Sequence, residues 1–342
     1  MPDNYFQTGH LYENPGSDLH GPRPVFNNIN VRSRHVYGKY IINEWNINGF
    51  NSVTKPYNTV FKREIIGSLY SDFWILPETH CRENEILEID NFTVFQVNRK
   101  VNDNNRRGSG GIAIIVNNSV LETHIIEGVY RGIDGQLGLK LKNKLNDLLL
   151  GIVGLYLPPD SYIYGQDAEH FFSEASVIWN DMTDCDLLIG AGDLNARTKD
   201  LKDYLPEIDG DLPIRSNPDM TKNAHGNNFV TFLKDNRAVI LNGRTTSQFN
   251  NFTFVSTRGS SVPDYVFCPL EHYQYCKEMK VMLVRDVVNG LSIPPPPSLP
   301  DHSILSATFF TSHFDFPQSE KVHSSHSITY EKIQKIKPNV KI

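Results

Sequence analysis

The stretch that decides the fold is Leu187-Leu188-Ile189-Gly190-Ala191-Gly192-Asp193-Leu194-Asn195-Ala196-Arg197, in a chain of 342 residues. A short apolar run contains two glycines and ends in one carboxylate and one carboxamide, Asp193 and Asn195, two residues apart. In an extended or tightly turned backbone these side chains face the same way. The glycines let the chain turn sharply and leave room for a ligand. The pair suits holding a water next to a phosphate oxygen, although Gly-Asp-x-Asn is equally typical of an Asx turn.

The composition describes a soluble globular protein, with 21% charged and 39% hydrophobic residues and a net charge of −6. No run approaches the roughly 18 apolar residues that span a membrane. The N-terminus has neither the basic nor the apolar region of a signal peptide. Four scattered cysteines (Cys81, Cys185, Cys268 and Cys276) form no disulfide or zinc pattern. We therefore expect a nuclear or cytoplasmic protein with no membrane contact and no disulfide-linked partner, and no oligomer is implied.

Residues 1–36 and 313–342 are polar, and we predict a mobile extension and a polar tail on either side of one domain, 37–312. Helical spacing runs from Val60 to Leu69, from Asp167 (an N-cap) to Thr183, and from Gly226 to Asn236. Apolar runs predict strands at Tyr40–Ile42, Phe73–Leu76, Phe92–Phe95, Gly111–Val116, Leu148–Tyr156, Leu187–Gly192, Val239–Leu241, Phe252–Val255, Tyr265–Phe267, Val281–Val284 and Ile304–Phe309. The turn Ser256–Ser261 suits a hairpin. Because strands outnumber helices, we expect an α/β domain of two packed sheets with helices outside.

Unusual polar residues sit where these strands end. They are Asn46, Asn48, Glu78, Tyr156, Asp193, Asn195, Asp264 and the pair Asp301-His302. Each alone is typical of a turn, a helix start or a cap. Together they mark one edge of the sheets, where catalytic groups gather on a rigid scaffold.

Two groups among them suit phosphoryl chemistry. Glu78 with Asn46 can hold Mg²⁺ through hard oxygen ligands, and Asp301 is assigned to the same metal set. Paired with Asp264, the His302 imidazole stays oriented and cationic, so that it can stabilise a phosphate that gains negative charge.

The remaining polar residues complete a hydrolytic site. Asp193 can orient and deprotonate water, Asn195 can hold the water or the phosphate in line, and Tyr156 can donate to a phosphate oxygen. Gly108-Ser109-Gly110-Gly111 lacks the Lys-Ser/Thr that follows in a P-loop, so we interpret it as a hairpin or bulge.

These motifs together resemble the endonuclease/exonuclease/phosphatase superfamily over roughly residues 40–310. The closest resemblance is to the abasic-endonuclease-like domain of non-LTR (LINE-type) retrotransposons. Its landmarks are Trp45-Asn46-Ile47-Asn48-Gly49-Phe50, Pro77-Glu78-Thr79-His80, Gly108-Ser109-Gly110-Gly111, Leu155-Tyr156-Leu157-Pro158-Pro159, Gly192-Asp193-Leu194-Asn195-Ala196-Arg197, Asn242-Gly243-Arg244-Thr245, Phe252-Thr253-Phe254, Arg258-Gly259-Ser260-Ser261-Val262-Pro263-Asp264-Tyr265 and Asp301-His302-Ser303.

The resemblance implies a four-layer α/β/β/α sandwich of two mixed sheets. It implies an enzyme that uses Mg²⁺ or Mn²⁺ to nick one strand of double-stranded DNA, leaving a 3′-hydroxyl that primes reverse transcription. It also implies the site roles given above. Asn48, Thr253, Arg197 and Arg258 are assigned to substrate binding, Thr253 because it matches a family position close to the site.

The sequence departs from the family pattern at three points near the site. Pro300 stands where the family has Ser before Asp-His, and Pro263 replaces an aliphatic residue and removes an N–H from an expected strand. Glu44 occupies a position that is normally apolar or small. All the expected catalytic side chains remain.

Two other functions are open from the sequence. One is a phosphatase or phosphodiesterase of the same fold acting on a small phosphoester, and the other is a catalytically weak module that binds nucleic acid or protein. A nuclease needs basic loops near its site, for which the candidates are Arg99, Lys100, Arg106, Arg107, Arg197 and Arg258.

Overall fold

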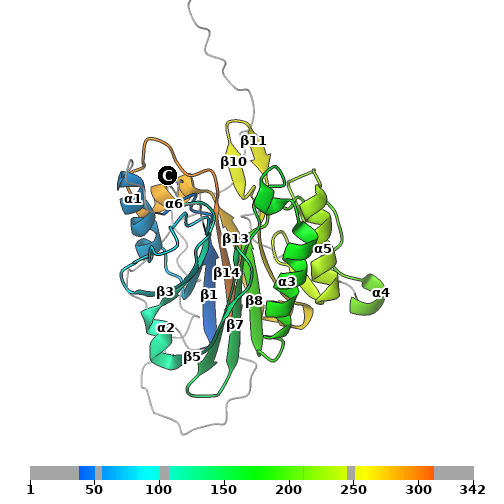
Figure 1. The fold of residues 1–342 in the computed structure, drawn as a ribbon. Coiled ribbons are helices and arrows are strands. Elements are labelled where there is room, and N and C mark those ends of the chain that lie inside the picture. Colours follow the sequence, from blue (N-terminus) through cyan, green and yellow to red (C-terminus); the bar gives the residue numbers. More distant parts are fainter. Residues whose placement is uncertain (1–37, 51–55, 101–107, 211, 245–250, 312–342) are drawn as a thin grey trace, which may run out of the picture.

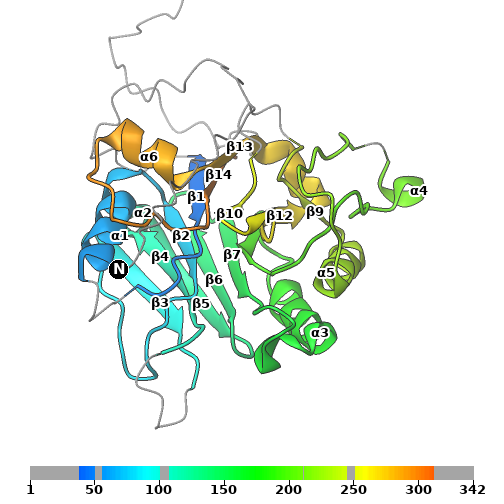
Figure 2. The same cartoon turned by 90° about the horizontal axis from the view of Figure 1, so that it is seen from above.

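The structure of the chain is a computed structural model, which describes residues 38–50, 56–100, 108–210, 212–244 and 251–311. Two six-stranded mixed sheets pack face to face, with helices on their outer faces (Figures 1 and 2). The expected four-layer sandwich is confirmed. The predicted extension 1–36, the tail 313–342, and Arg106 and Arg107 lie outside the described residues.

The first sheet has the spatial order β13 (Cys276–Met282), β14 (Ile304–Phe310), β1 (Lys39–Glu44), β2 (Phe73–Pro77), β4 (Ile112–Asn117) and β3 (Phe92–Val97). Strands β1 and β2 are parallel, and the other neighbours are antiparallel. The central pair therefore points its two carboxyl ends towards the same edge of the sheet.

The second sheet has the order β5 (His124–Arg131), β6 (Gln136–Asn143), β7 (Leu149–Tyr156), β8 (Leu187–Asp193), β12 (Asp264–Pro269) and β9 (Ala238–Ile240). Its one parallel pair is β7 with β8. Strand β8 is fully buried, and its residues alternate between two cores: Leu187 and Ile189 face the first sheet, whereas Leu188 faces outwards. The opening stretch is thus a central strand whose odd-numbered residues point between the sheets.

Helices cover both outer faces. In Figure 2, α1 (Pro56–Ser68) and α6 (Val284–Leu291) lie over the first sheet, and α3 (Ala168–Asn180) and α5 (Ala224–Asp235) lie over the second. Each pair closes an apolar core, with Phe61 and Val287 in one and Phe171 and Phe229 in the other. Asp167 caps α3 through the N–H of His170, as the sequence predicted. The short helices are α2 (Asn118–Thr123) and α4 (Pro206–Asp209), with 3₁₀ turns at Ile163–Gly165 and Leu270–Tyr275. None of the helices in the described segments is long and apolar enough to cross a membrane.

Three local predictions need correction. The turn after Ser256 joins β10 (Phe254–Ser256) to β11 (Gly259–Ser261) in a separate two-stranded ladder, so the hairpin pairs Phe254 and Val255 with β11 and not with the strand that contains Tyr265–Phe267. Strands β5 and β6 lie between Val116 and Leu148, where no strand was predicted from the sequence, although Leu137, Leu139 and Leu141 alternate as a half-buried strand requires. The stretch after Leu283 forms α6 rather than the end of a strand.

Candidate active site

The ends of the central strands place six polar side chains at one edge of the sandwich. In the second sheet, Asp193 lies in register with Tyr156 on β7 and with Asp264 on β12. Three site residues therefore stand side by side on neighbouring strands, and each continues the face that points to the first sheet.

The first sheet supplies the opposing set. Tyr40 and Ile42 of β1 face the second sheet, so Asn46, which follows with the same alternation, faces it too. His302 precedes β14 on one side of Asn46, and its carbonyl accepts a hydrogen bond from the Trp45 indole at 3.2 Å. Glu78 follows β2 on the other side.

Each residue of the first sheet meets one of the second, which gives three cross-sheet pairs. His302 Nδ1 lies 3.0 Å and 3.1 Å from the two carboxylate oxygens of Asp264. The Asn46 amide donates to Asp193 Oδ2 at 2.7 Å, and the Tyr156 hydroxyl donates to Glu78 Oε1 at 2.5 Å. The predicted constellation is thus brought together by hydrogen bonds that join the two sheets.

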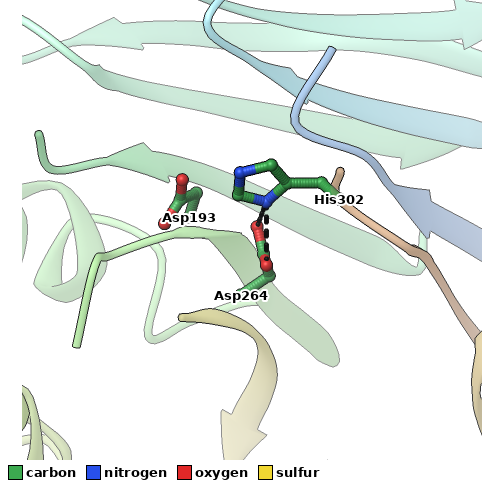
Figure 3. A group of neighbouring side chains, drawn as sticks. All are labelled: Asp193, Asp264 and His302. Atoms are coloured by element: carbon green, nitrogen blue, oxygen red, sulfur yellow. Dashed lines mark hydrogen bonds and ion pairs between the residues drawn. The ribbon is translucent and has the colours of Figure 1, made fainter. Parts of the chain in front are cut away.

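The His302–Asp264 pair carries a positive charge on its imidazole. Burial disfavours that charge, but the Asp264 carboxylate, helped by Asp193 and Glu78, raises the pKa of His302 to about 9. Figure 3 shows Asp264 beneath Nδ1, while the other ring nitrogen faces the side on which Asp193 lies. The edge of the Phe254 ring packs against the imidazole, with ring centroids 5.0 Å apart. At neutral pH the imidazolium therefore has one N–H free of Asp264 and directed towards the site.

This pair predicts a pH-dependent contribution to stability. The pKa of His302 rises from 6.5 to about 9 on folding, so its contribution is complete below pH 6.5 and is lost as the pH rises through the folded value. The difference in unfolding free energy between wild type and His302→Gln should shrink over this window by about 3 kcal/mol. Urea unfolding with a chelator present measures it. A difference that stays constant from pH 6 to 9.5 would contradict the charge state.

Asp193 is buried and held by two donors. Besides the Asn46 amide, the backbone N–H of Asn195 donates to Asp193 Oδ1 at 2.9 Å, which closes an Asx turn. Burial and the neighbouring Asp264 charge raise the pKa of Asp193 to about 8. A carboxylate poised near the working pH suits a general base. The Asx turn predicted as one interpretation of the opening stretch is therefore present, and it fixes the orientation of the Asp193 carboxylate.

Glu78 reaches its partner only through an unusual backbone. In β2, Trp74 and Leu76 point to the outer core, and strict alternation would send Glu78 the same way. A φ of +55° at Glu78 instead lets its carboxylate accept from Tyr156 between the sheets. Burial and the Glu78 charge hold the pKa of Tyr156 well above its usual range, so the phenol remains a donor.

Strained backbone conformations recur around the site. Asn48, His80 and Asn195 also have positive φ values, of 42°, 52° and 46°. Such residues persist where the surrounding structure fixes them, often at functional sites. Here Lys62 contributes by donating to the carbonyls of Ile47 and Gly49 at 2.6 Å and 2.5 Å, and burial lowers its pKa to about 8.

A cavity of about 210 Å³ opens beside His302 and Asn195. Its other lining residues include Arg197, and also Asn223, Phe254, Ser261, Pro263, Pro159 and Asp160. Arg197 is not free, because its guanidinium makes two hydrogen bonds of 2.8 Å and 2.7 Å to Asp219. Nothing in the sequence pattern singled out Asp219 as this partner.

The other predicted site residues lie outside the three pairs. Thr253 is buried, and its hydroxyl accepts a hydrogen bond from the backbone N–H of Asp264 at 3.2 Å. Arg258 is exposed at the tip of the β10–β11 hairpin, and Asn48 is exposed above Asn46. Asp301 is exposed and lines a second cavity, of about 150 Å³, with Pro300. The described contacts thus do not join Asp301 to Glu78 or Asn46.

Two of the departures from the family pattern now have a structural account. Pro263 precedes the first residue of β12, so it removes no hydrogen bond from that strand, contrary to our expectation. Glu44 is fully buried one step below Asn46, and neither of its carboxylate oxygens has a hydrogen-bond partner in the described part of the chain. Burial, with the charges of Asp264 and Asp193, raises the pKa of Glu44 well above its usual range and so favours its protonated form.

Comparison with known proteins gives matches in three dimensions only. No protein-family model and no curated protein sequence matches the chain. The AP endonuclease LMAP from Leishmania major matches with a TM-score of 0.58 at 14% identity, covering 85% of this chain and 95% of that one. The 3′ phosphatase NExo from Neisseria, bound to a product DNA hairpin, matches with a TM-score of 0.55 at 13% identity, covering 79% and 99%.

An endonuclease/exonuclease/phosphatase family protein from Leptotrichia buccalis C-1013-b gives a TM-score of 0.51 at 12% identity, covering 79% of this chain and 99% of that one. These identities are low, but the three matches cover 79–85% of this chain and 95–99% of the other chains. This chain therefore has the endonuclease/exonuclease/phosphatase fold.

Proposed function

We propose that the chain is a metal-dependent phosphodiesterase that nicks one strand of double-stranded DNA and leaves a 3′-hydroxyl, as in target-site cleavage by non-LTR retrotransposons. One observation carries this proposal. The three cross-sheet pairs place a cationic imidazole, a carboxylate with a pKa of about 8 and a neutral phenol around one edge of the sandwich. An intracellular location, in the nucleus or cytoplasm, belongs to the same proposal.

The chemistry divides among these residues. Asp193 takes a proton from the attacking water, which Asn195 helps to hold in line with the leaving 3′-oxygen. As the water oxygen bonds to phosphorus, the bond from phosphorus to the 3′-oxygen breaks, and the 3′-oxygen takes up a proton from solvent. The free N–H of the His302 imidazolium donates to a phosphate oxygen as negative charge builds in the transition state. Asp264 keeps the imidazole oriented and charged, and Tyr156 fixes the Glu78 carboxylate.

The residues beside Tyr156 suit a hard divalent cation. Glu78 Oε1 accepts the hydrogen bond from the Tyr156 hydroxyl, whereas Glu78 Oε2 lies 3.7 Å from His80 Nε2. The Glu78 side chain is 19% exposed. Glu78, together with the Asn46 amide oxygen, which accepts the Asn48 N–H at 2.9 Å, would hold Mg²⁺ or Mn²⁺. When bound, the ion would polarise the phosphate and offset its charge.

A second donor set is less suitable. Ligand atoms of Asp193, Asp264 and His302 lie within 4.8 Å of one another. However, His302 Nδ1 already engages both oxygens of Asp264, and a cation there would compete with that pair. We therefore assign the ion to Glu78.

The cavity favours one further candidate, hydrolysis of a compact phosphoester such as a 3′-terminal phosphate. The cavity is small, about 210 Å³, and the acidic Asp160 is among its lining residues. The charge of Arg197, which also lines it, is offset by the ion pair with Asp219. A duplex contact would rest instead on exposed cations such as Arg258 on the β10–β11 hairpin, which adjoins the site through a bridge between Phe254 and His302.

Incubation with supercoiled plasmid tests the proposal. With Mg²⁺ we expect conversion to nicked circles that a DNA polymerase can extend from the 3′-hydroxyl. With a chelator, or with the His302→Ala variant, we expect at least about 10²-fold less nicking. A parallel reaction with a 3′-phosphorylated oligonucleotide tests the compact substrate.

The outcomes separate the candidates. Phosphate release from the oligonucleotide without nicked circles would favour the compact phosphoester. Nicking that survives in His302→Ala would contradict the assigned site, and binding of DNA without any cleavage would leave only a binding module.

A further inference from the structure

Arg99 is a buried cation beside the site that no step above uses. It follows β3 by two residues, and only 7% of its side chain is exposed. The carbon at the centre of its guanidinium lies 5.8 Å from the ring centroid of Tyr156 and 4.4 Å from that of Tyr164. Both distances are within the range of a cation–π interaction. The charge therefore lies against two aromatic rings, one of which belongs to the active site.

The Asp134 carboxylate holds the guanidinium at its Nε atom. Its Nε donates to Asp134 in the turn between β5 and β6. Its Nη2 is buried and has no hydrogen-bond partner among the described residues. A buried donor without an acceptor costs free energy, so hydrogen bonding alone does not account for this position. Contact with the two rings does.

The glycine-rich stretch of residues 108–111 makes room for this arrangement. Gly110 has a φ of +60°, and a Cβ there would lie 2.3 Å from the guanidinium carbon of Arg99. A Cβ at Gly111 would lie 2.7 Å from the hydroxyl of Thr79, next to Glu78. The stretch 108–111, which does not match a P-loop, therefore packs against Arg99 and against Thr79 after the end of β2.

Arg99 also links Tyr156 to the rim of the cavity. Tyr164 belongs to the 3₁₀ turn Ile163–Gly165, and the same loop contributes Pro159 and Asp160 to the cavity lining. The loop is tied down because His225 hydrogen-bonds the carbonyl of Gly165 at 2.8 Å. One cation therefore contacts both the site tyrosine and the loop beside it.

We infer that Arg99 is a positioning residue for the reaction, whose charge, held between Tyr156 and Tyr164, keeps the Tyr156 hydroxyl against Glu78. The inference rests on the proposed function, because it assigns a role within that site. It requires the positive charge at residue 99 and not only the bulk of the side chain. Arginine suits the position better than lysine, because its planar group stacks on rings while it pairs with a carboxylate.

Kinetics of Arg99→Met, Arg99→Lys and Tyr164→Leu test the role. Since small misplacements at an active site are costly, Arg99→Met should lower kcat by about 10- to 100-fold with little change in KM. Arg99→Lys should recover part of the loss, because it keeps the charge. Tyr164→Leu, at a side chain 56% exposed, should fold readily and show a smaller decrease in kcat.

Arg244→Met is the matched control. Arg244 pairs with the Asp203 carboxylate, and its guanidinium lies 5.6 Å from the centroid of the Tyr204 ring. Like Arg99, it therefore combines an ion pair with a cation–π contact. Its other hydrogen bonds go to the carbonyls of Pro213 and Ile240, not to a site residue. This variant should melt at a lower temperature and yet cleave at the wild-type rate while folded.

A readout independent of cleavage is the NMR signal of Tyr156 in protein carrying ¹³Cζ-tyrosine, assigned with Tyr156→Phe. We expect this signal to shift or broaden in Arg99→Met and to stay in place in Arg244→Met. An unchanged Tyr156 signal in Arg99→Met would overturn the inference, whatever the rate. A shifted signal in a protein whose wild type cleaves no phosphoester would refute the proposed function and leave the positioning of Tyr156 supported.

Discussion

Replacing Asp193 with asparagine is expected to lower kcat for phosphodiester cleavage by about 10³-fold while the protein stays folded. The amide cannot take a proton from water, yet its oxygen can still accept the Asn195 N–H that closes the Asx turn. The protein should stay folded with a moderate loss of stability: the substitution removes a buried carboxylate from beside Asp264, but it sets the new amide nitrogen against the Asn46 amide, which donates to Asp193 Oδ2. Single-turnover cleavage and urea unfolding of the same preparation measure the two effects.

Asp203→Asn is the matched control for this substitution. Asp203 is also a buried carboxylate, but it pairs with Arg244 and accepts the N–H of Ile240. Removing its charge leaves Arg244 without its counter-ion, so stability should fall while the cleavage rate of the folded protein is kept. If Asp193→Asn cleaves as fast as Asp203→Asn, then Asp193 is not the base.

Gly192→Ala is expected to lower the free energy of unfolding by more than about 4 kcal/mol, which few substitutions do. Gly192 has a φ of +152°, and a Cβ there would lie 1.7 Å from the carbonyl oxygen of Leu155 on the neighbouring strand. Backbone would have to move in the centre of the second sheet, directly before Asp193. Urea unfolding followed by circular dichroism measures the loss.

Gly259→Ala separates strain from collision. Gly259 has a similar φ of +142°, but no atom lies within 4 Å of the position a Cβ would take. Its substitution should therefore cost only the backbone strain, about 1–3 kcal/mol. Equal losses in the two variants would show that the packing of Gly192 against Leu155 does not matter.

Most of the sandwich follows from local patterns in the sequence. Runs such as Ile112–Val116 and the apolar face of α3 predict their elements because burial imposes periods of two and of 3.6 residues. Pairing between distant strands leaves no such local mark. For that reason the order within each sheet, and the separate β10–β11 ladder, could not be predicted from the residues between them.

In the candidate site, too, the residues could be predicted from the sequence, whereas their contacts could not. Residue types at strand ends indicated Glu78, Asp193 and His302 as members of a set, because each alone is typical of a turn, a helix start or a cap. Which residue faces which depends on register and on single backbone angles, such as the left-handed conformation of Glu78. Arg99 was predicted to belong to a basic loop, but the structure buries it, because Gly110 and Asp134 make a place for it.

The three cross-sheet pairs also determine the earliest point in protein synthesis at which the candidate site can be complete. Their partners are 38, 78 and 147 residues apart along the chain. Of the six residues, His302 comes last in the chain, two residues before β14. The ribosome must therefore synthesise the chain through residue 302 before the imidazole can pair with Asp264. A nascent chain, or one whose sheets have formed but not yet docked, holds only unpaired halves of each bond. A chain that ends before His302 therefore lacks one of the three pairs, and the candidate site is complete only when both sheets are present and packed together.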